Sequence, residues 1–181
     1  MQDEIRRDQI VGSRRFSNYF WSIFLGLGGL GFFLAGISSY FNINFLPFTD
    51  AKELIFIPQG IVMMFYGTLS ISICLYITLT VVWDIGSGYN EYNKIENLVK
   101  IVRKGFPGKN REIFLTYPLT SIQAIGIKIS EGLNPTRALY LCLKDERKIP
   151  LTPVQQPISI SNLEKQAADL AKFLDLKLED L

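Results

Sequence analysis

The sequence predicts an α+β membrane protein, in which a hairpin of two transmembrane helices is joined to a small antiparallel β domain closed by a C-terminal helix. Three observations predict this fold class. Two long runs in the first half of the chain carry no Asp, Glu, Lys or Arg apart from a short stretch between them. Short alternating apolar segments separated by turns fill most of the second half. An amphipathic segment then lies close to the C-terminus.

The apolar runs set the expected domain boundaries. Residues 1–17 form a basic N-terminal segment, and residues 18–83 form the hairpin, with spans at about 19–40 and 57–83 and a short connection at 42–53. About 20 apolar residues cross the hydrocarbon of a bilayer, and both runs are long enough. A cleaved signal peptide is the alternative for the first run, but its apolar part is too long for one.

Lys and Arg predict the orientation of the hairpin. Four arginines precede the first span, one lysine lies in the connection, and fourteen Lys and Arg follow the second span. Because loops rich in Lys and Arg stay in the cytoplasm, both termini are expected on the cytoplasmic side or on the equivalent stromal side of a plastid membrane.

Small residues predict how the spans pack. Span one carries Gly28, Gly31 and Ala35 at helical spacing, and span two carries Gly60 and Gly67. Small side chains let helix backbones approach each other in lipid. Two interpretations stay open: these faces close the hairpin on itself, or they dock against the spans of another protein, with Gly26 and Gly29 offering a second face. The spans contain no ionisable residue, which argues against a transporter.

The soluble domain is expected over residues 84–181. Residues 84–94 are polar and contain glycine, which indicates a loop leaving the membrane. Four strands follow, at 97–104, 112–118, 121–130 and 137–144, and then a short edge strand leads into an extended loop with Pro150, Pro153 and Pro157. A helix is predicted over residues 161–176, where Ser161 and Glu164 have capping-box spacing. This order is similar to that of a pleckstrin-homology-like half barrel, an analogy that concerns the fold alone.

Composition excludes several function classes. The chain has no histidine, so it cannot hold a Ser-His-Asp or Cys-His nucleophile or a histidine-ligated metal or haem. Its two cysteines lie in apolar surroundings and are expected to be buried and unpaired. A net charge of +2 without a run of five or six like charges predicts no nucleic-acid binding. We expect no enzyme and no cofactor.

The stretch GFPGKNR, residues 105–111, is the one candidate phosphate loop. A Walker loop needs four residues between its glycines and a Ser or Thr after the lysine, and this stretch has neither. A hairpin loop between two strands fits better. Its cations form either a solvated tip or a docking patch for an acidic protein surface or anionic lipid. The candidate partner-binding residues are Arg14, Arg15, Arg103, Lys109, Arg111 and Glu164, the last of which is also explained as a helix cap.

A series of segments resembles a known family. RRFSNYFW, GISSY, FIPQGIVMMFYG, WDIGSGYN, GFPGKNR and EKQAADLAKFL occur in this order over residues 14–174. Together they resemble the photosystem I assembly factor family of cyanobacteria and plastids, known as the fourth hypothetical chloroplast reading frame. The resemblance implies a thylakoid protein that helps photosystem I subunits assemble, with no catalytic residue. Arg103, Lys109 and Arg111 match the loop of that family.

Three hypotheses follow. The first is a non-catalytic scaffold whose partners are photosystem I subunits or assembly intermediates and membrane lipid, within an oligomer or larger assembly complex. The second is a membrane-anchored module of pleckstrin-like fold that binds lipid or another ligand, and whose isolated domain, about residues 91–181, would bind anionic liposomes. The third, a membrane-anchored enzyme, is the weakest, because the chain lacks histidine and a carboxylate pair.

Overall fold

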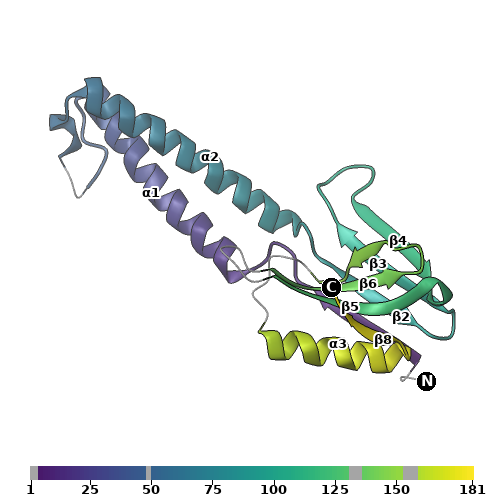
Figure 1. The fold of residues 1–181 in the computed structure, drawn as a ribbon. Coiled ribbons are helices and arrows are strands. Elements are labelled where there is room, and N and C mark those ends of the chain that lie inside the picture. The colour runs from purple at the N-terminus through teal and green to yellow at the C-terminus, as the bar shows by residue number, and fades with distance from the viewer. Residues whose placement is uncertain (1–3, 48–49, 131–135, 153–158) are drawn as a thin grey trace. The chain divides into compact units, whose positions relative to one another are not determined.

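The computed structural model describes residues 4–47, 50–130, 136–152 and 159–181 (Figure 1). The chain divides into two compact units, one of Gly12–Ile85 and the other of Met1–Val11 together with Gly86–Leu181. The N-terminal segment therefore belongs to the same unit as the C-terminal half.

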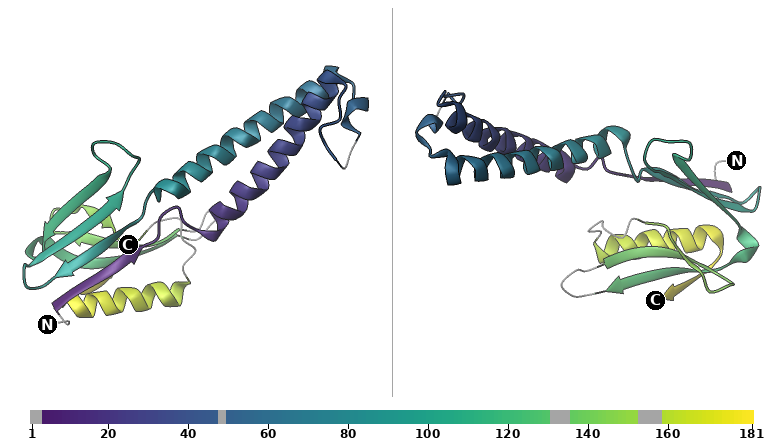
Figure 2. Two further views of the ribbon diagram at one scale, coloured as in Figure 1. Left: turned by 180° about the vertical axis from the view of Figure 1, so that it is seen from behind. Right: turned by 90° about the horizontal axis from the view of Figure 1, so that it is seen from above.

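The first unit consists of two long apolar helices that lie side by side (Figures 1 and 2). Helix α1 (Phe16–Phe41) has 26 residues and α2 (Ile61–Trp83) has 23. The short turns η2 (Ala51–Glu53) and η3 (Phe56–Gly60) lie between them. Both helices are long and apolar enough to cross a membrane, and most of their large side chains are exposed.

Glycines bring the two helices together. A Cβ atom on Gly67 would lie 2.5 Å from the backbone nitrogen of Phe33, and one on Gly36 would lie 2.7 Å from the carbonyl oxygen of Gly60. Such close approach of two backbones is possible only where no side chain intervenes. Hydroxyl groups add hydrogen bonds along the same seam, since Ser70 Oγ donates to the carbonyl of Leu25 at 2.9 Å.

The second unit begins with a four-stranded antiparallel sheet. Its strands are β1 (Ile5–Ile10), β2 (Gly88–Asn93), β3 (Leu98–Lys104) and β4 (Glu112–Pro118), arranged in this order. The N-terminal segment thus forms an edge of the sheet, opposite the edge formed by β4.

A second four-stranded sheet follows in the order β7-β6-β5-β8. After the turn η4 (Leu119–Ser121), it contains β5 (Ile122–Ser130), β6 (Thr136–Leu143), β7 (Lys148–Pro150) and β8 (Lys177–Asp180). Strand β8 pairs with β5 in parallel, and the other pairs are antiparallel. Helix α3 (Ile160–Leu174) packs against β5, β6 and β8 (Figure 2).

One hydrophobic core joins both sheets and α3. It contains Val99 and Ile101 from the first sheet, Ile125 and Leu141 from the second, and the apolar stripe of α3, whose members are Leu163, Ala167, Leu170 and Leu174. Period-two alternation in the strands and the helical spacing in α3 direct these side chains inward. The α+β class, the strands predicted at 97–144 and the C-terminal helix are confirmed.

Three details of the prediction differ from the structure. Residues 84–94 are not all loop, because Gly88–Asn93 form β2, whose ladder partners β1 and β3 lie elsewhere in the sequence. Helix α3 is capped by Ser159 and not by Ser161: Ser159 Oγ accepts a hydrogen bond from the backbone nitrogen of Asn162 at 3.4 Å. The helix also does not end the domain, since β8 follows it. The prolines at 153 and 157 lie outside the described residues.

Candidate partner-binding surfaces

The hairpin has a closed seam and an open groove. Gly60 and Gly67 lie in the seam between the helices, and a Cβ atom on Gly29 would lie 3.0 Å from Ser70 Cβ. Gly28 and Gly31 face away from it, since no atom lies within 4 Å of a Cβ built on either. Ala35, which is 7% exposed, is buried beside them.

Two neighbouring cavities form the groove beside Gly28. One, of about 540 Å³, is lined by Phe24, Leu25, Gly28, Phe32, Val62, Met63, Tyr66, Leu69, Ser70 and Ile73. The other, of about 480 Å³, shares Gly28, Phe32 and Met63 with the first and continues to Gly31, Ala35 and Leu54. The lining is mainly apolar, with Ser70 and Asp50 among its few polar residues, so the groove suits an acyl chain or an apolar helix.

Arg14 and Arg15 are bound to the backbone near the ends of the helices. Arg14 Nε donates to the carbonyl of Val81 at 3.3 Å and lies 3.9 Å from Asp84 Oδ1. A cation in this position satisfies the last carbonyls of α2 and interacts favourably with the helix dipole. Arg15 Nε donates to the carbonyl of Gly12 at 3.1 Å.

Arg103 points into the second unit. Its guanidinium donates to Asn90 Oδ1 at 2.8 Å and to the carbonyl of Leu151 at 3.0 Å, and it also reaches the carbonyls of Tyr89 and Val102. Asn90 Nδ2 donates to the same carbonyl of Leu151 at 3.0 Å. Burial lowers the pKa of Arg103. This side chain therefore ties β2 and β3 to the segment after β7.

Lys109 and Arg111 lie in the loop between β3 and β4. Both are exposed, and the backbone nitrogen of Gly105 donates to the carbonyl of Arg111 at 2.6 Å, which closes the base of the loop. The sequence motif thus separates into one inward cation, Arg103, and two cations on an exposed loop. Glu164 is also exposed, on the solvent side of α3.

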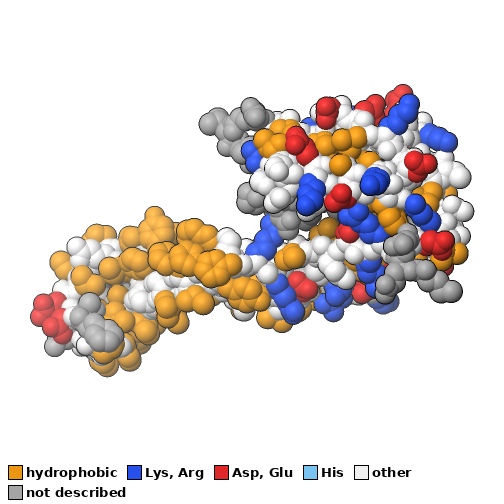
Figure 3. Space-filling view, turned by 90° about the horizontal axis from the view of Figure 1, so that it is seen from below, with side chains coloured by type: hydrophobic (Ala, Val, Ile, Leu, Met, Phe, Trp, Pro, Cys, Tyr) orange, Lys and Arg blue, Asp and Glu red, His pale blue; other side chains and the backbone are white. Residues whose placement is uncertain are grey.

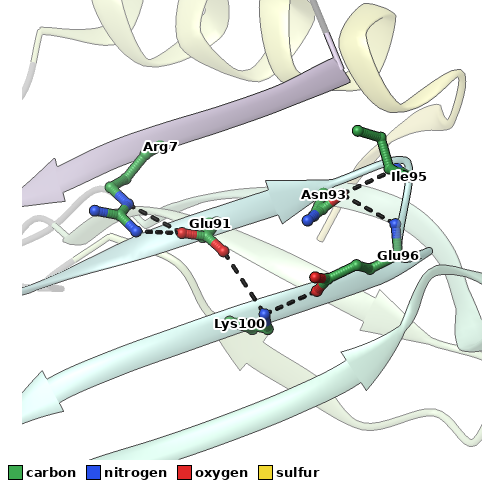
Figure 4. Close-up of polar contacts among 6 residues, drawn as sticks. All are labelled: Arg7, Glu91, Asn93, Ile95, Glu96 and Lys100. Atoms are coloured by element: carbon green, nitrogen blue, oxygen red, sulfur yellow. Dashed lines mark hydrogen bonds and ion pairs between the residues drawn. The ribbon is translucent and has the colours of Figure 1, made fainter. Parts of the chain in front are cut away.

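A network of charges lies on the outer face of the first sheet, over β1, β2 and the start of β3 (Figure 4). Arg7 Nε donates to Glu91 Oε2 at 3.0 Å, and Lys100 Nζ lies 3.8 Å from Glu91 Oε1 and 2.9 Å from Glu96 Oε2. Asn93 Oδ1 accepts hydrogen bonds from the backbone nitrogens of Ile95 and Glu96 and fixes the turn. These charges pair with one another across β1, β2 and β3.

A mixed cavity of about 380 Å³ lies between the first sheet and α3, and its lining includes Asp8, Tyr92, Leu139, Gln166 and Leu170. The cations in its lining already have partners: Arg6 Nε donates to Asp8 Oδ1 at 3.0 Å, and Arg7 Nε donates to Glu91 Oε2 at 3.0 Å. Burial raises the pKa of Tyr92 and keeps its phenol neutral.

The surfaces of the two units differ in chemistry. Apolar side chains cover the helices, whereas Lys, Arg, Asp and Glu are interspersed over the second unit (Figure 3). The profile of the Ycf4 family matches residues 3–172. The chain belongs to the Ycf4 family.

Several relatives of the chain carry the same name. The Photosystem I assembly protein Ycf4 of Trieres chinensis is 79% identical over 181 residues, which cover all of both chains. The proteins of that name in Pyropia yezoensis and Chlorokybus atmophyticus are 55% identical over 175 residues and 52% identical over 179 residues. These alignments cover 97% and 99% of this chain and 94% and 95% of the relatives.

In this Ycf4 family member, sequence reasoning missed two features. The first is the pair of hydrogen bonds from the Arg103 and Asn90 side chains to the backbone carbonyl of Leu151. No sequence motif marks a backbone carbonyl as an acceptor. The second is the exposed apolar strand β4, in which Ile113 is 53% and Phe114 62% exposed. Its apolar alternation was visible, but only the pairing of the strands showed that it lies at an edge.

Proposed function

We propose that the chain is a non-catalytic, membrane-anchored scaffold that assists the assembly of photosystem I in the thylakoid membrane. The observation that carries this proposal is the family membership over nearly the whole chain, together with relatives named photosystem I assembly proteins. The two apolar helices support a membrane hairpin. The excess of Lys and Arg outside the connection supports placing both termini on the stromal side.

In this proposal the open surfaces bind assembly intermediates. The groove beside Gly28 and Gly31 receives an apolar helix or acyl chain, and Lys109 and Arg111 attract an acidic surface. Arg14 and Arg15 are lesser candidates, because both already donate to backbone carbonyls. Glu164 also stays a candidate. Arg103 is better explained as an internal tie, so its replacement should act through the fold.

The test is the light-induced P700 absorbance change in a strain that lacks the gene, normalised to photosystem II fluorescence. A selective fall in P700 that returns with the wild-type gene supports the proposal, and an unchanged signal contradicts it. Lys109→Glu with Arg111→Glu should lower co-migration with photosystem I intermediates while the amount of the protein stays constant.

The alternative, a lipid- or ligand-binding module of pleckstrin-like fold, stays a prediction. Its best support is the mixed cavity beside Tyr92. The liposome test needs the full chain, because a fragment of residues 91–181 would lose β1 and half of β2. Steeply salt-dependent binding to anionic vesicles but not to neutral ones would support this alternative.

A further inference from the structure

The first sheet has one edge with an unusual composition. Strand β4 reads EIFLTYP and has seven residues, of which Ile113 is 53%, Phe114 62% and Leu115 38% exposed. Natural sheets protect an open edge with charge, proline, a bulge or a very short strand. Positions 113–117 of β4 carry neither a charged residue nor a proline. This edge therefore resembles a strand that binds a partner more than an edge strand that stays in contact with water.

The register shows which backbone groups the edge offers. Hydrogen bonds from the nitrogen of Gly105 to Arg111 and from the nitrogen of Leu119 to Asn97 fix the alternation along β3 and β4. Paired residues in an antiparallel ladder alternate between bonded and non-bonded. Glu112, Phe114 and Thr116 therefore direct their backbone N–H and C=O groups away from β3, and in the part of the chain that the structure describes these groups have no partner.

The exposed side chains lie on both faces of this edge. Leu115 pairs with Ile101 and therefore faces the core side of the sheet, whereas Phe114 pairs with Val102 on the outer side. The apolar surface of the core thus extends beyond the region that the second sheet covers.

We propose that β4 binds an extended segment of a partner protein by strand addition. The segment would extend the first sheet, with apolar side chains beside Ile113, Phe114 and Leu115 and an acidic residue where it passes Arg111 and Lys109. Main-chain hydrogen bonds supply affinity in this mode, and alternate side chains supply specificity. This inference rests on the proposed scaffold function and names the surface that holds the assembling subunit.

Two other occupants fit less well. Acyl chains cannot bond to the outward N–H and C=O groups of Glu112, Phe114 and Thr116, so a lipid surface would leave these groups unpaired. A second copy pairing antiparallel through β4 would bring residues 119–121, which include no acid, beside Lys109. An extended partner segment with an acidic end can pair with the outward backbone groups of β4 and also with the cations at positions 109 and 111.

The deciding variant is Thr116→Pro in the full-length protein. Proline removes the outward N–H of residue 116 and also fixes the φ angle there, and an edge strand accepts proline at such a position. Thr116→Val is the matched control, because it keeps the N–H and the β-branched shape. Phe114→Lys is a second, independent variant that adds a protecting charge to the edge.

Two quantities are measured. Amide hydrogen exchange is compared between photosystem I intermediates isolated from thylakoids and the chain alone in nanodiscs, and co-migration with photosystem I core subunits is measured for each variant. We expect exchange of the outward amides of residues 112, 114 and 116 to slow by roughly tenfold or more in the intermediates relative to nanodiscs. Thr116→Pro and Phe114→Lys should lower co-migration with photosystem I core subunits at least several-fold. Thr116→Val should leave co-migration unchanged, and amide protection in β5 should be equal in all variants.

Several results would overturn the proposal. If deletion of the gene lowers P700 but both edge variants co-migrate normally, the scaffold function stands and the edge has no part in it. If deletion leaves P700 normal, the scaffold function itself fails. Slowed exchange of β4 in nanodiscs of anionic lipid without any partner would assign the edge to lipid, and dispersal of a homo-oligomer by Thr116→Pro would assign it to a second copy.

Discussion

The two sheets of the second unit have four strands each, yet they protect their edges differently. Strand β7 has three residues and ends at Pro150, and β8 reads KLED, with three charges in four residues. At the first sheet, β1 reads IRRDQI and is likewise charged. Strand β4 is the exception, since its exposed side chains are mainly apolar.

The same contrast occurs in the hairpin. Gly67 lies in the seam between α1 and α2, whereas Gly28 opens onto an apolar groove. In each unit, therefore, one part is closed by contacts within the chain and another part is left open. Apolar or small residues alone do not identify a binding surface, because the same residue types build the closed parts. Substitutions at a closed position and at an open one should therefore differ in their effects.

The largest difference is expected between two leucines of the sheets. Leu141→Ala removes a side chain that is 0% exposed in the core, and we expect it to lower the free energy of unfolding by about 2–5 kcal/mol. Leu115→Ala truncates the same side chain at 38% exposure and should cost about 1 kcal/mol or less. Native-state hydrogen exchange of β5 amides in the full chain measures the loss of stability in each variant. Equal losses would mean that β4 is as closed as β6.

Gly67→Ala and Gly28→Ala test the hairpin in the same way. The new methyl group at position 67 would lie 2.5 Å from the backbone of Phe33 and force the helices apart, at a cost of about 1–3 kcal/mol. At position 28 it enters open space, and the higher helix propensity of Ala should leave stability unchanged or raise it by up to about 1 kcal/mol.

Titration of the full chain in micelles with a denaturing detergent, followed by the fluorescence of Trp21 and Trp83, compares these variants. Destabilisation by Gly28→Ala with none by Gly67→Ala would contradict this packing. It would mean that the face of α1 that carries Gly28 is the one that contacts α2.

Arg103 and Lys109 allow a comparison between a cation that is hydrogen-bonded inside the second unit and one that lies on an exposed loop. Arg103→Ala leaves Asn90 Oδ1 and the carbonyl of Leu151 with fewer donors, and we expect a loss of about 1–3 kcal/mol by hydrogen exchange of β3. Arg103→Lys should not restore it, since one ammonium cannot replace a planar fork that reaches several acceptors. Lys109→Ala should leave β3 protection unchanged. A stable Arg103→Ala variant would return Arg103 to the list of docking residues.

Local patterns predicted those parts of the fold that depend on local sequence. Uncharged length predicted α1 and α2, and alternation predicted β3 to β6, because each pattern reports burial of one face. Strands β1, β2 and β8 escaped notice because they are short and polar. Strands β1 and β8 pair with strands far away in the sequence, as in Arg7 opposite Glu91 and Leu178 opposite Ile125, whereas β2 pairs with β1 and also with the neighbouring β3.

The candidate surfaces were predicted less well than the fold, for a physical reason. GFPGKNR and its flanking arginine look like one basic cluster in the sequence, but a strand directs successive side chains to opposite faces. Arg103 therefore reaches the interior, while the loop beyond it keeps Lys109 outside. The open edge of β4 could not be predicted at all from its own residues, because whether a strand lies at an edge depends on every other strand of the sheet.

The smallest effect concerns the start of α3, where sequence and structure choose different serines. Ser159 Oγ accepts from the nitrogen of Asn162 at 3.4 Å, a long hydrogen bond, so Ser159→Ala should cost only about 0.5–1 kcal/mol. Ser161→Ala, two residues into the helix, should be neutral or slightly stabilising, because Ala has the higher helix propensity. Hydrogen exchange of the first amides of α3 in the full chain resolves a difference of this size. A larger loss from Ser161→Ala would show that the capping box with Glu164 forms in solution, and the surface offered by Glu164 would then be smaller than its exposure suggests.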